Sequence, residues 1–450
     1  MKTIASIVLA SCVLASAANA QPAVPATATA PGPAPTPAAA AAIAPAPTAP
    51  RLSLADALAR ARQQHPAIRS TQATIAAAHA RVDLANVITK PTVTAAGSLV
   101  TGSNNGLNGG FFEPALSTGI SAQANLRLYD FGLTRANIRA AEANAAASDA
   151  VLPTTMLDIT STVTVAYLEA IARERLVVSA DATVRNEDAH VDQARRFVAA
   201  QAKDPIEVVQ AQARAANARS VLAQAQSNAA VALANLRAAI GAVDATDDFA
   251  INTDWPALPT DPPPTLATLV ASARQHRPEI AQLDRQIAAS NATLNAARAG
   301  RRPVLNAQAQ TQWNPGSNNW SPQPSWSAGL TLSWQFFDGG RAAADTNVAS
   351  ANVANALAQR DSLLISLHAQ LESARAQIVA ATVNVSASSE AVTAAQAQLK
   401  LANARYAAGL GSQIELGDAQ TAVTTAEGNL INAEWQLARA WTQLQRAIGE

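Results

Sequence analysis

Two carboxylates stand close together in the segment GSQIELGDAQ, where Glu415 and Asp418 follow a glycine-rich turn. A spacing of three residues places both side chains on one face of a helix, within its first turn. There they can stabilise the helix dipole, by about 0.3 to 1 kcal/mol each. They can also attract cations if several copies meet around a narrow opening. The residues alone favour the first interpretation.

Other residues that could carry chemistry are sparse. The five histidines lie far apart in the chain and lack the spacing of a metal site: His65, His79, His190, His276 and His368. The sequence has no glycine-rich phosphate loop and no nucleophile elbow. These residues give only weak support for a catalytic or metal site, and we predict no cofactor and no metal. The formal net charge is zero, which gives no indication of a nucleic-acid partner.

The first fifty residues have the composition of a leader followed by a tether. Residues 1–20 combine one lysine, an apolar stretch and the sequence ANA before Gln21, which predicts an export signal peptide. The sequence LASC, which ends at the only cysteine, Cys12, also fits a lipoprotein box, so lipidation there stays open. Residues 21–50 hold nine of the 24 prolines and predict an extended Pro/Ala-rich tether.

Long helices are predicted for most of the remaining chain. Apolar residues make up 49% of the sequence but aromatic residues only 4%, so closely packed alanine-rich helices are favoured over large cores. Residues 357–406 repeat large apolar side chains every seven positions, and the positions three residues later are mostly small. This pattern is typical of supercoiled helices. In the first half of the chain, Pro153 predicts either a break in the corresponding helix or the effective start of the first long helix.

The segment from Trp326 to Phe336 differs, because apolar residues alternate with small or polar ones. Strict alternation predicts a β-strand with two unlike faces. Residues 118–128 alternate in the same way, and partner strands are predicted at 92–101 and 304–313. Exposed loops at 102–114 and 314–324 complete two hairpins. Strands of about ten to twelve residues are long enough to cross a bilayer when tilted.

The chain contains two copies of one plan, at residues 51–250 and 265–450, joined by a linker at 251–264. Lys90-Pro91 corresponds to Arg302-Pro303 at an offset of 212 residues, whereas LRAAIG and LQRAIG, ending at Gly241 and Gly449, differ by 208. Each copy reads as helix, hairpin, long helix, short tip and return helix. The first copy begins with a capped helix at Ser53 and Asp56, and its tip is predicted at 199–205.

Four strands per chain cannot close in a membrane, because unpaired edge groups are costly in hydrocarbon. We therefore expect a mixed, mainly α fold with membrane β structure. Three chains would share a 12-stranded β-barrel, and their tandem-duplicated helical hairpins would form an α-barrel.

The order of these elements resembles the TolC family of outer-membrane efflux and secretion channels, the outer membrane factors. The resemblance covers roughly residues 52–449 and rests on LSLADAL, the paired hairpins, FFDGG and RYAAGLGSQIELGDAQ. It implies a homotrimeric exit channel in the outer membrane lipid with its helical part in the periplasm. Its partners would be a periplasmic adaptor and an inner-membrane pump, and the resemblance implies that the protein is not an enzyme. The alternative is a non-channel, helical-repeat surface or adhesin-like protein, which the amphipathic hairpins disfavour.

The resemblance also assigns roles to residues of the tips. It implies that Glu415 and Asp418 surround the periplasmic aperture, and Glu207 holds the corresponding place in the first copy. Family members lock the closed tip with a tyrosine and an arginine. Tyr406 matches the tyrosine, but Gly411 occupies the arginine position, so the lock is weaker here or built differently.

The second tip also resembles the turn to which the adaptor docks in this family. This turn consists of Gly409, Leu410, Gly411 and Ser412. An ordinary helix C-cap with Gly409 in the left-handed conformation explains the same residues, and both interpretations can hold together. The sequence does not reveal the cargo.

Overall fold

The computed structural model describes residues 51–103, 114–242, 249–259, 262–313 and 324–450. The predicted signal peptide, Cys12 and the tether lie outside the described residues, as does most of both hairpin loops.

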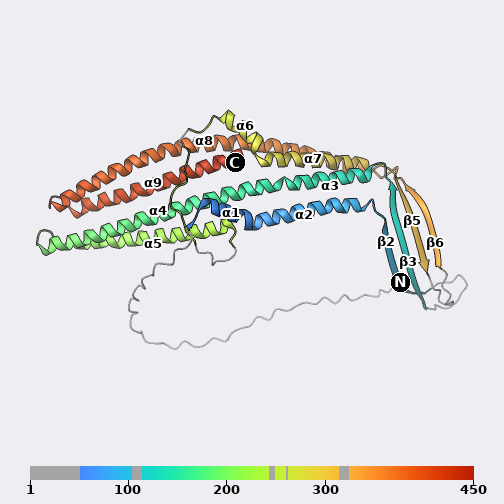
Figure 1. Ribbon diagram of the computed structural model, residues 1–450, viewed down its shortest axis with the longest axis horizontal. Coiled ribbons are helices and arrows are strands. Elements are labelled where there is room, and N and C mark those ends of the chain that lie inside the picture. Colours follow the sequence, from blue (N-terminus) through green and yellow to red (C-terminus); the bar gives the residue numbers. More distant parts are fainter. Residues whose placement is uncertain (1–50, 104–113, 243–248, 260–261, 314–323) are drawn as a thin grey trace, which may run out of the picture. The chain divides into compact units, whose positions relative to one another are not determined.

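The described chain is largely helical (Figure 1). The first copy contains α1 (Leu54–Gln64), α2 (Pro66–Val87), β2 (Thr92–Ser103), β3 (Pro114–Tyr129), α3 (Leu133–Asp149), α4 (Val151–Ala199) and α5 (Ile206–Ile240). The second contains α6 (Leu266–His276), α7 (Pro278–Ala299), β5 (Val304–Trp313), β6 (Pro324–Ser333), α8 (Arg341–Ala407) and α9 (Gln413–Ile448). None of the described helices combines the length and apolar character needed to cross a membrane.

The long helices confirm the heptad prediction. Helix α8 runs without interruption for 67 residues. Its heptad residues Leu371, Ile378 and Tyr406 are buried, as are Ala374 and Ala381 three positions after the first two, whereas Leu357 near the start of the series is exposed. The first copy instead divides the equivalent length between α3 and α4, and the break before Pro153 was predicted. Helix α4 packs against α5 and α8 against α9, and α4 also packs against α9, which joins the two hairpins.

Side chains cap the first helix, as the sequence predicts, and also the helices that follow the two hairpins. Ser53 and Asp56 form a capping box at the start of α1. After each hairpin, an aspartate accepts hydrogen bonds from the amides two and four residues later: Asp130 from Gly132 and Thr134, and Asp338 from Gly340 and Ala342. The amides of Ala342 and Gly340 hold the pKa of Asp338 below its usual value.

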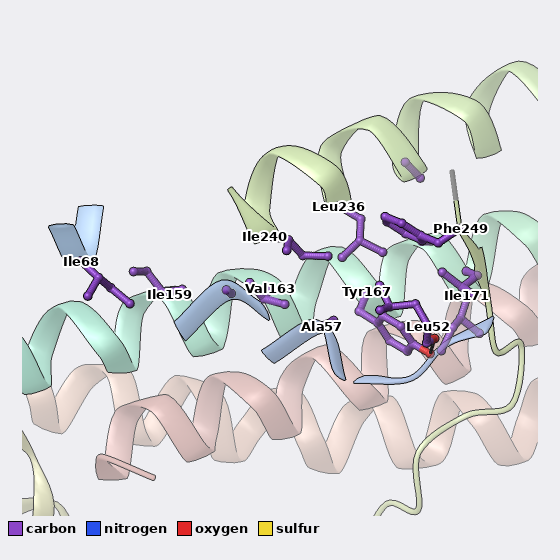
Figure 2. Close-up of a cluster of buried hydrophobic side chains, with 14 residues drawn as sticks. Leu52, Ala57, Ile68, Ile159, Val163, Tyr167, Ile171, Leu236, Ile240 and Phe249 are labelled. Carbon is purple, nitrogen blue, oxygen red and sulfur yellow. Dashed lines mark hydrogen bonds between the residues drawn. The ribbon is translucent and has the colours of Figure 1, made fainter. Parts of the chain in front are cut away.

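Two equivalent hydrophobic cores show the duplication in the packing. Figure 2 shows the first core, where α1, α2, α4 and α5 meet. The pairs of equivalent buried residues are Ile68 and Ile280, Val163 and Leu371, and Leu236 and Leu444. The first pair differs by 212 positions and the other two by 208. These are the offsets found before and after the hairpins in the sequence.

The first core carries an addition that the sequence analysis did not predict. Strand β1 (Arg51–Leu52) pairs in parallel with β4 (Ala250–Ile251). The buried Tyr167 hydroxyl donates to the Leu52 carbonyl at 3.0 Å (Figure 2). The segment predicted as a linker is also held to the hairpins, because the Trp255 indole donates to Glu434 at 2.7 Å.

The four long strands form one antiparallel sheet in the order β2-β3-β5-β6. Because directly opposite residues share a face, the register shows that the alternation continues across all four strands. Opposite pairs such as Val93 and Ala124, or Ala307 and Leu330, lie on one face. The other face carries the polar residues, and Gln308 donates to Thr331 there at 3.1 Å. The predicted faces are confirmed as far as Arg127. Beyond it the register shifts, so that Tyr129 lies opposite Leu305 and the predicted alternation does not hold at Leu128.

The end of β6 corrects one expectation. Alternation continues to Phe336, but the strand ends at Ser333, and Trp334 and Phe336 are exposed beyond it. The cause is the length of the neighbouring strand. Ser333 pairs with Val304, the first residue of β5, so no paired backbone remains for the residues that follow.

Candidate functional site

The candidate site is built on two helical tips, one at the end of each hairpin. In the second tip, Gly409 adopts the left-handed conformation with a φ of 77°. The Gly409 amide donates to the Tyr406 carbonyl, and the Leu410 amide donates to the Arg405 carbonyl. These two bonds form a Schellman motif, so the predicted glycine C-cap is confirmed.

The first tip has the same backbone motif with a different sequence. Gln201 takes the left-handed position with a φ of 57°, although it is not a glycine. Its amide donates to the Val198 carbonyl, and the Ala202 amide donates to the Phe197 carbonyl. Gln201 precedes Gly409 by 208 residues, which is the repeat offset. The two turns are therefore equivalent in position, although their residue types differ.

Tyr406 and Glu207 come together between the two tips. The Tyr406 side chain is fully buried, and its hydroxyl donates to Glu207 Oε2 at 3.1 Å. Its ring packs edge-on against Phe197 of the first tip, with the ring centroids 5.5 Å apart. Burial, together with the neighbouring Glu207 carboxylate, raises the pKa of Tyr406 to about 12. The phenol therefore stays protonated and serves as a hydrogen-bond donor.

Lys203 completes this contact and was missed in the sequence analysis. Its ammonium group donates to the Gly411 carbonyl at 2.8 Å and lies 3.6 Å from Glu207 Oε1. It also lies 5.5 Å from the centroid of the Tyr406 ring. Lys203 precedes Gly411 by 208 residues and thus occupies the equivalent position of the first tip. The repeat offset was the signal that could have identified it. We call Lys203, Glu207, Tyr406 and Gly411 the inter-tip cluster.

Glu415 and Asp418 are not part of the inter-tip cluster. Ser412 caps α9, because its hydroxyl accepts a hydrogen bond from the Glu415 amide at 3.2 Å. The Glu415 carboxylate lies 3.4 Å from Arg405 Nε, and both side chains are partly exposed. Asp418 is exposed one turn further along. Glu415 therefore has a compensating cation within its own tip, whereas Asp418 faces solvent in the described chain.

The predicted docking turn presents one large apolar side chain. Leu410 is 77% exposed, and Ser412 beside it is also exposed. Gly411 is buried, and a Cβ atom there would lie 3.0 Å from the Tyr406 backbone nitrogen. A side chain at this position would therefore push the turn away from α8.

A second contact between the hairpins lies behind the tips. The Arg214 side chain, on α5, donates to the Gln413 carbonyl at the start of α9. The Arg214 guanidinium lies directly against Gly417, where a Cβ atom would occupy its place. The sequence analysis gave neither residue a role. Within the described residues, no three His, Cys, Asp or Glu side chains are grouped to hold a metal ion.

Two copies of a long helical hairpin, joined at their tips and attached to a sheet with one apolar face, define the architecture of an outer-membrane channel protomer. Comparison with known proteins agrees. The family model of the outer membrane efflux proteins matches residues 57–242 and 269–450, and the chain belongs to this family. It is thus an outer-membrane protein in a family of channels.

Individual relatives support this assignment at low sequence identity. Nodulation protein T of Rhizobium leguminosarum bv. trifolii is 23% identical over 379 residues, covering 83% of this chain and 80% of that protein. The CmeC outer membrane channel of Campylobacter jejuni has the same fold, with a TM-score of 0.74 at 15% identity over 88% of this chain and 85% of that one. The outer membrane protein VceC of Vibrio cholerae gives 0.70 at 18% identity, over 88% and 96%.

Proposed function

We propose that the protein is the outer-membrane exit channel of an efflux or secretion system and is not an enzyme. The observation that carries this proposal is the sheet, which presents a continuous polar face and a continuous apolar face. An apolar outer face suits lipid, and a polar inner face suits a water-filled passage. The alternative of a passive surface protein gives no reason for such a sheet.

A homotrimer accounts for the edges of that sheet. Among the described residues, strands β2 and β6 each have one partner strand, so each has an edge with a row of unpaired backbone groups. Pairing β6 of one copy with β2 of the next would satisfy these groups, and three copies would close a twelve-stranded sheet. Such trimers should be found in the outer-membrane fraction and should dissociate on heating. Recovery of monomers alone would contradict the proposal.

The inter-tip cluster is proposed to hold the periplasmic end closed. Family members have an arginine at the position that Gly411 occupies here. Lys203 supplies a cation at this place from the other tip. Its bond to the Gly411 carbonyl and the bond from Tyr406 to Glu207 both join one hairpin to the other. Opening would require the hairpins to separate at these contacts. A periplasmic adaptor that engages the exposed Leu410 and its turn, and that connects to an inner-membrane pump, could drive this separation.

The acidic pair is proposed to face the entrance. In a trimer, Glu415 and Asp418 would supply six carboxylates around the aperture, where like charges attract cations. Changing both to Ala should reduce the cation selectivity of the channel in planar bilayers. It should also abolish block by multivalent cations added from the periplasmic side.

The matched control for this experiment is Glu390→Ala, which removes an exposed carboxylate from α8. This variant should conduct like the parent. If the Glu415 and Asp418 double variant keeps the parent's selectivity and block, the pair only caps α9. Control of the entrance would then have to be sought at Tyr406 and Glu207.

A further inference from the structure

A cavity of about 400 Å³ opens between α4, α5 and α9, beyond the tips. Buried residues form its floor, including Ala180, Glu187 and Gln420. Exposed residues form its mouth, including Asn217, Val221 and Thr421. Thr421 lies three residues after Asp418, so the mouth lies on the side of α9 that carries this aspartate. The volume is at the lower end of the range for small-molecule sites.

Glu187 is the unusual feature of this cavity. Only 4% of the residue is exposed, and its Oε2 atom has no hydrogen-bond partner among the described residues. Burial raises the pKa of Glu187, and Arg214 lowers it in part. A buried carboxylate without a partner is costly, and such groups are rare in native structures. A ligand that supplies the missing donor would remove this cost.

Arg214 also lines the cavity but does not fill this role. Its guanidinium donates to the Gln413 carbonyl and lies against Gly417, and among the described residues it forms no salt bridge with Glu187. One turn along α4, burial lowers the pKa of His190, so this side chain adds no positive charge near neutral pH. The cavity therefore retains an unmatched acceptor beside apolar and hydroxyl groups.

We propose that this cavity binds a small organic cation with an ammonium group on an apolar body. The ammonium group would donate to Glu187 Oε2 at the floor. Thr183 and Thr424, whose hydroxyls lie 3.0 Å apart, offer further acceptors, and the apolar body would contact Ala218 and Val221. The proposal does not depend on the channel function, because binding can be measured without conduction.

The test uses the full-length protein in detergent and benzylammonium as the probe, with calorimetry as the measurement. Glu187→Gln removes the charge and keeps the shape of the side chain. Its affinity for benzylammonium should fall by about tenfold or more, the loss expected for a charge-assisted hydrogen bond. Neutral benzyl alcohol should bind both proteins equally. The matched control, Glu390→Gln on the exposed face of α8, should bind benzylammonium like the parent.

The stability of Glu187→Gln provides an independent check. Burial raises the pKa of Glu187 in the folded protein, so folding favours the neutral form of this side chain. The free energy of unfolding therefore falls as pH rises from the ordinary carboxyl pKa through the pKa of Glu187 in the folded protein. The variant should therefore melt at a higher temperature than the parent near neutral pH. A lower melting temperature would show that Glu187 already has a partner and would count against the site.

A second variant keeps the proposal testable if Glu187→Gln fails to fold. Val221 is 55% exposed at the mouth, so Val221→Trp should narrow the cavity without disturbing a core. It should weaken benzylammonium binding. Unchanged affinity for benzylammonium in either variant would overturn the proposal. Tighter binding of benzoate than of benzylammonium would also overturn it, because the cavity would then bind an anion through Arg214.

Discussion

Tyr406→Phe tests the inter-tip cluster with the smallest possible change. The substitution removes only the hydroxyl group and leaves the ring against Phe197 and Lys203. Glu207 loses one donor but keeps Lys203 at 3.6 Å. A hydrogen bond to a charged group contributes about 1.5 to 3 kcal/mol. Because Lys203 remains, we expect the lower part of this range, which shifts the closed-to-open equilibrium by about tenfold.

The assay is the open probability of single channels in planar bilayers. Tyr406→Phe should raise it, and so should Glu207→Gln, which also removes the ion pair with Lys203. The two changes together should have less than the sum of their separate effects, because both remove the bond between Tyr406 and Glu207. The matched control is Tyr167→Phe. Tyr167 is also buried and donates to a carbonyl, but it lies in the first core. This control should lower the melting temperature without raising the open probability.

The pH dependence gives a second measurement on the same bond. The pKa of Tyr406 is raised to about 12, so the protonated phenol is favoured in the folded protein. Its contribution to the closed state should be complete below the ordinary tyrosine pKa of about 10 and should be lost as pH rises toward 12. Tyr406→Phe should lack this component. If it opens no more often than the parent, or if Tyr167→Phe opens equally often, the inter-tip cluster does not hold the tips together.

Two further predictions concern the sheet and the docking turn. Leu330 lies on the apolar face, so Leu330→Arg should destabilise the membrane-inserted protein by about 2 to 4 kcal/mol near the bilayer midplane and reduce the amount of assembled trimer. Thr331→Arg, on the polar face, should assemble and alter the conductance of the channel. Equal tolerance of arginine on both faces would refute the assignment of the apolar face to lipid. Gly409→Val places a branched side chain at a φ of 77°, so it should disturb the turn and stop export while trimers still form, and normal export would show that docking lies elsewhere.

Local patterns in the sequence were enough to predict the long helices and the four long strands, but not β1 and β4. Alternation in residues 118–128 and 326–336, heptads in 357–406, and the cap at Ser53 each depend on neighbours a few positions apart. Burial on one side of a strand or helix imposes such a period on the sequence, so the period can be read without the fold. The duplication was visible for the same reason, since equivalent positions keep equivalent residue types.

The tertiary structure alone decided which residues meet. Tyr406 and Glu207 were both named from the sequence, but their contact, and the place of Lys203 beside them, join residues about 200 positions apart. No local period records how two tips pack together. The pairing of β1 with β4 and the burial of Glu187 also result from packing between distant segments. The sequence by itself determined the long helices, the four long strands and the faces of these strands, and packing between its two copies determined the inter-tip cluster and the cavity.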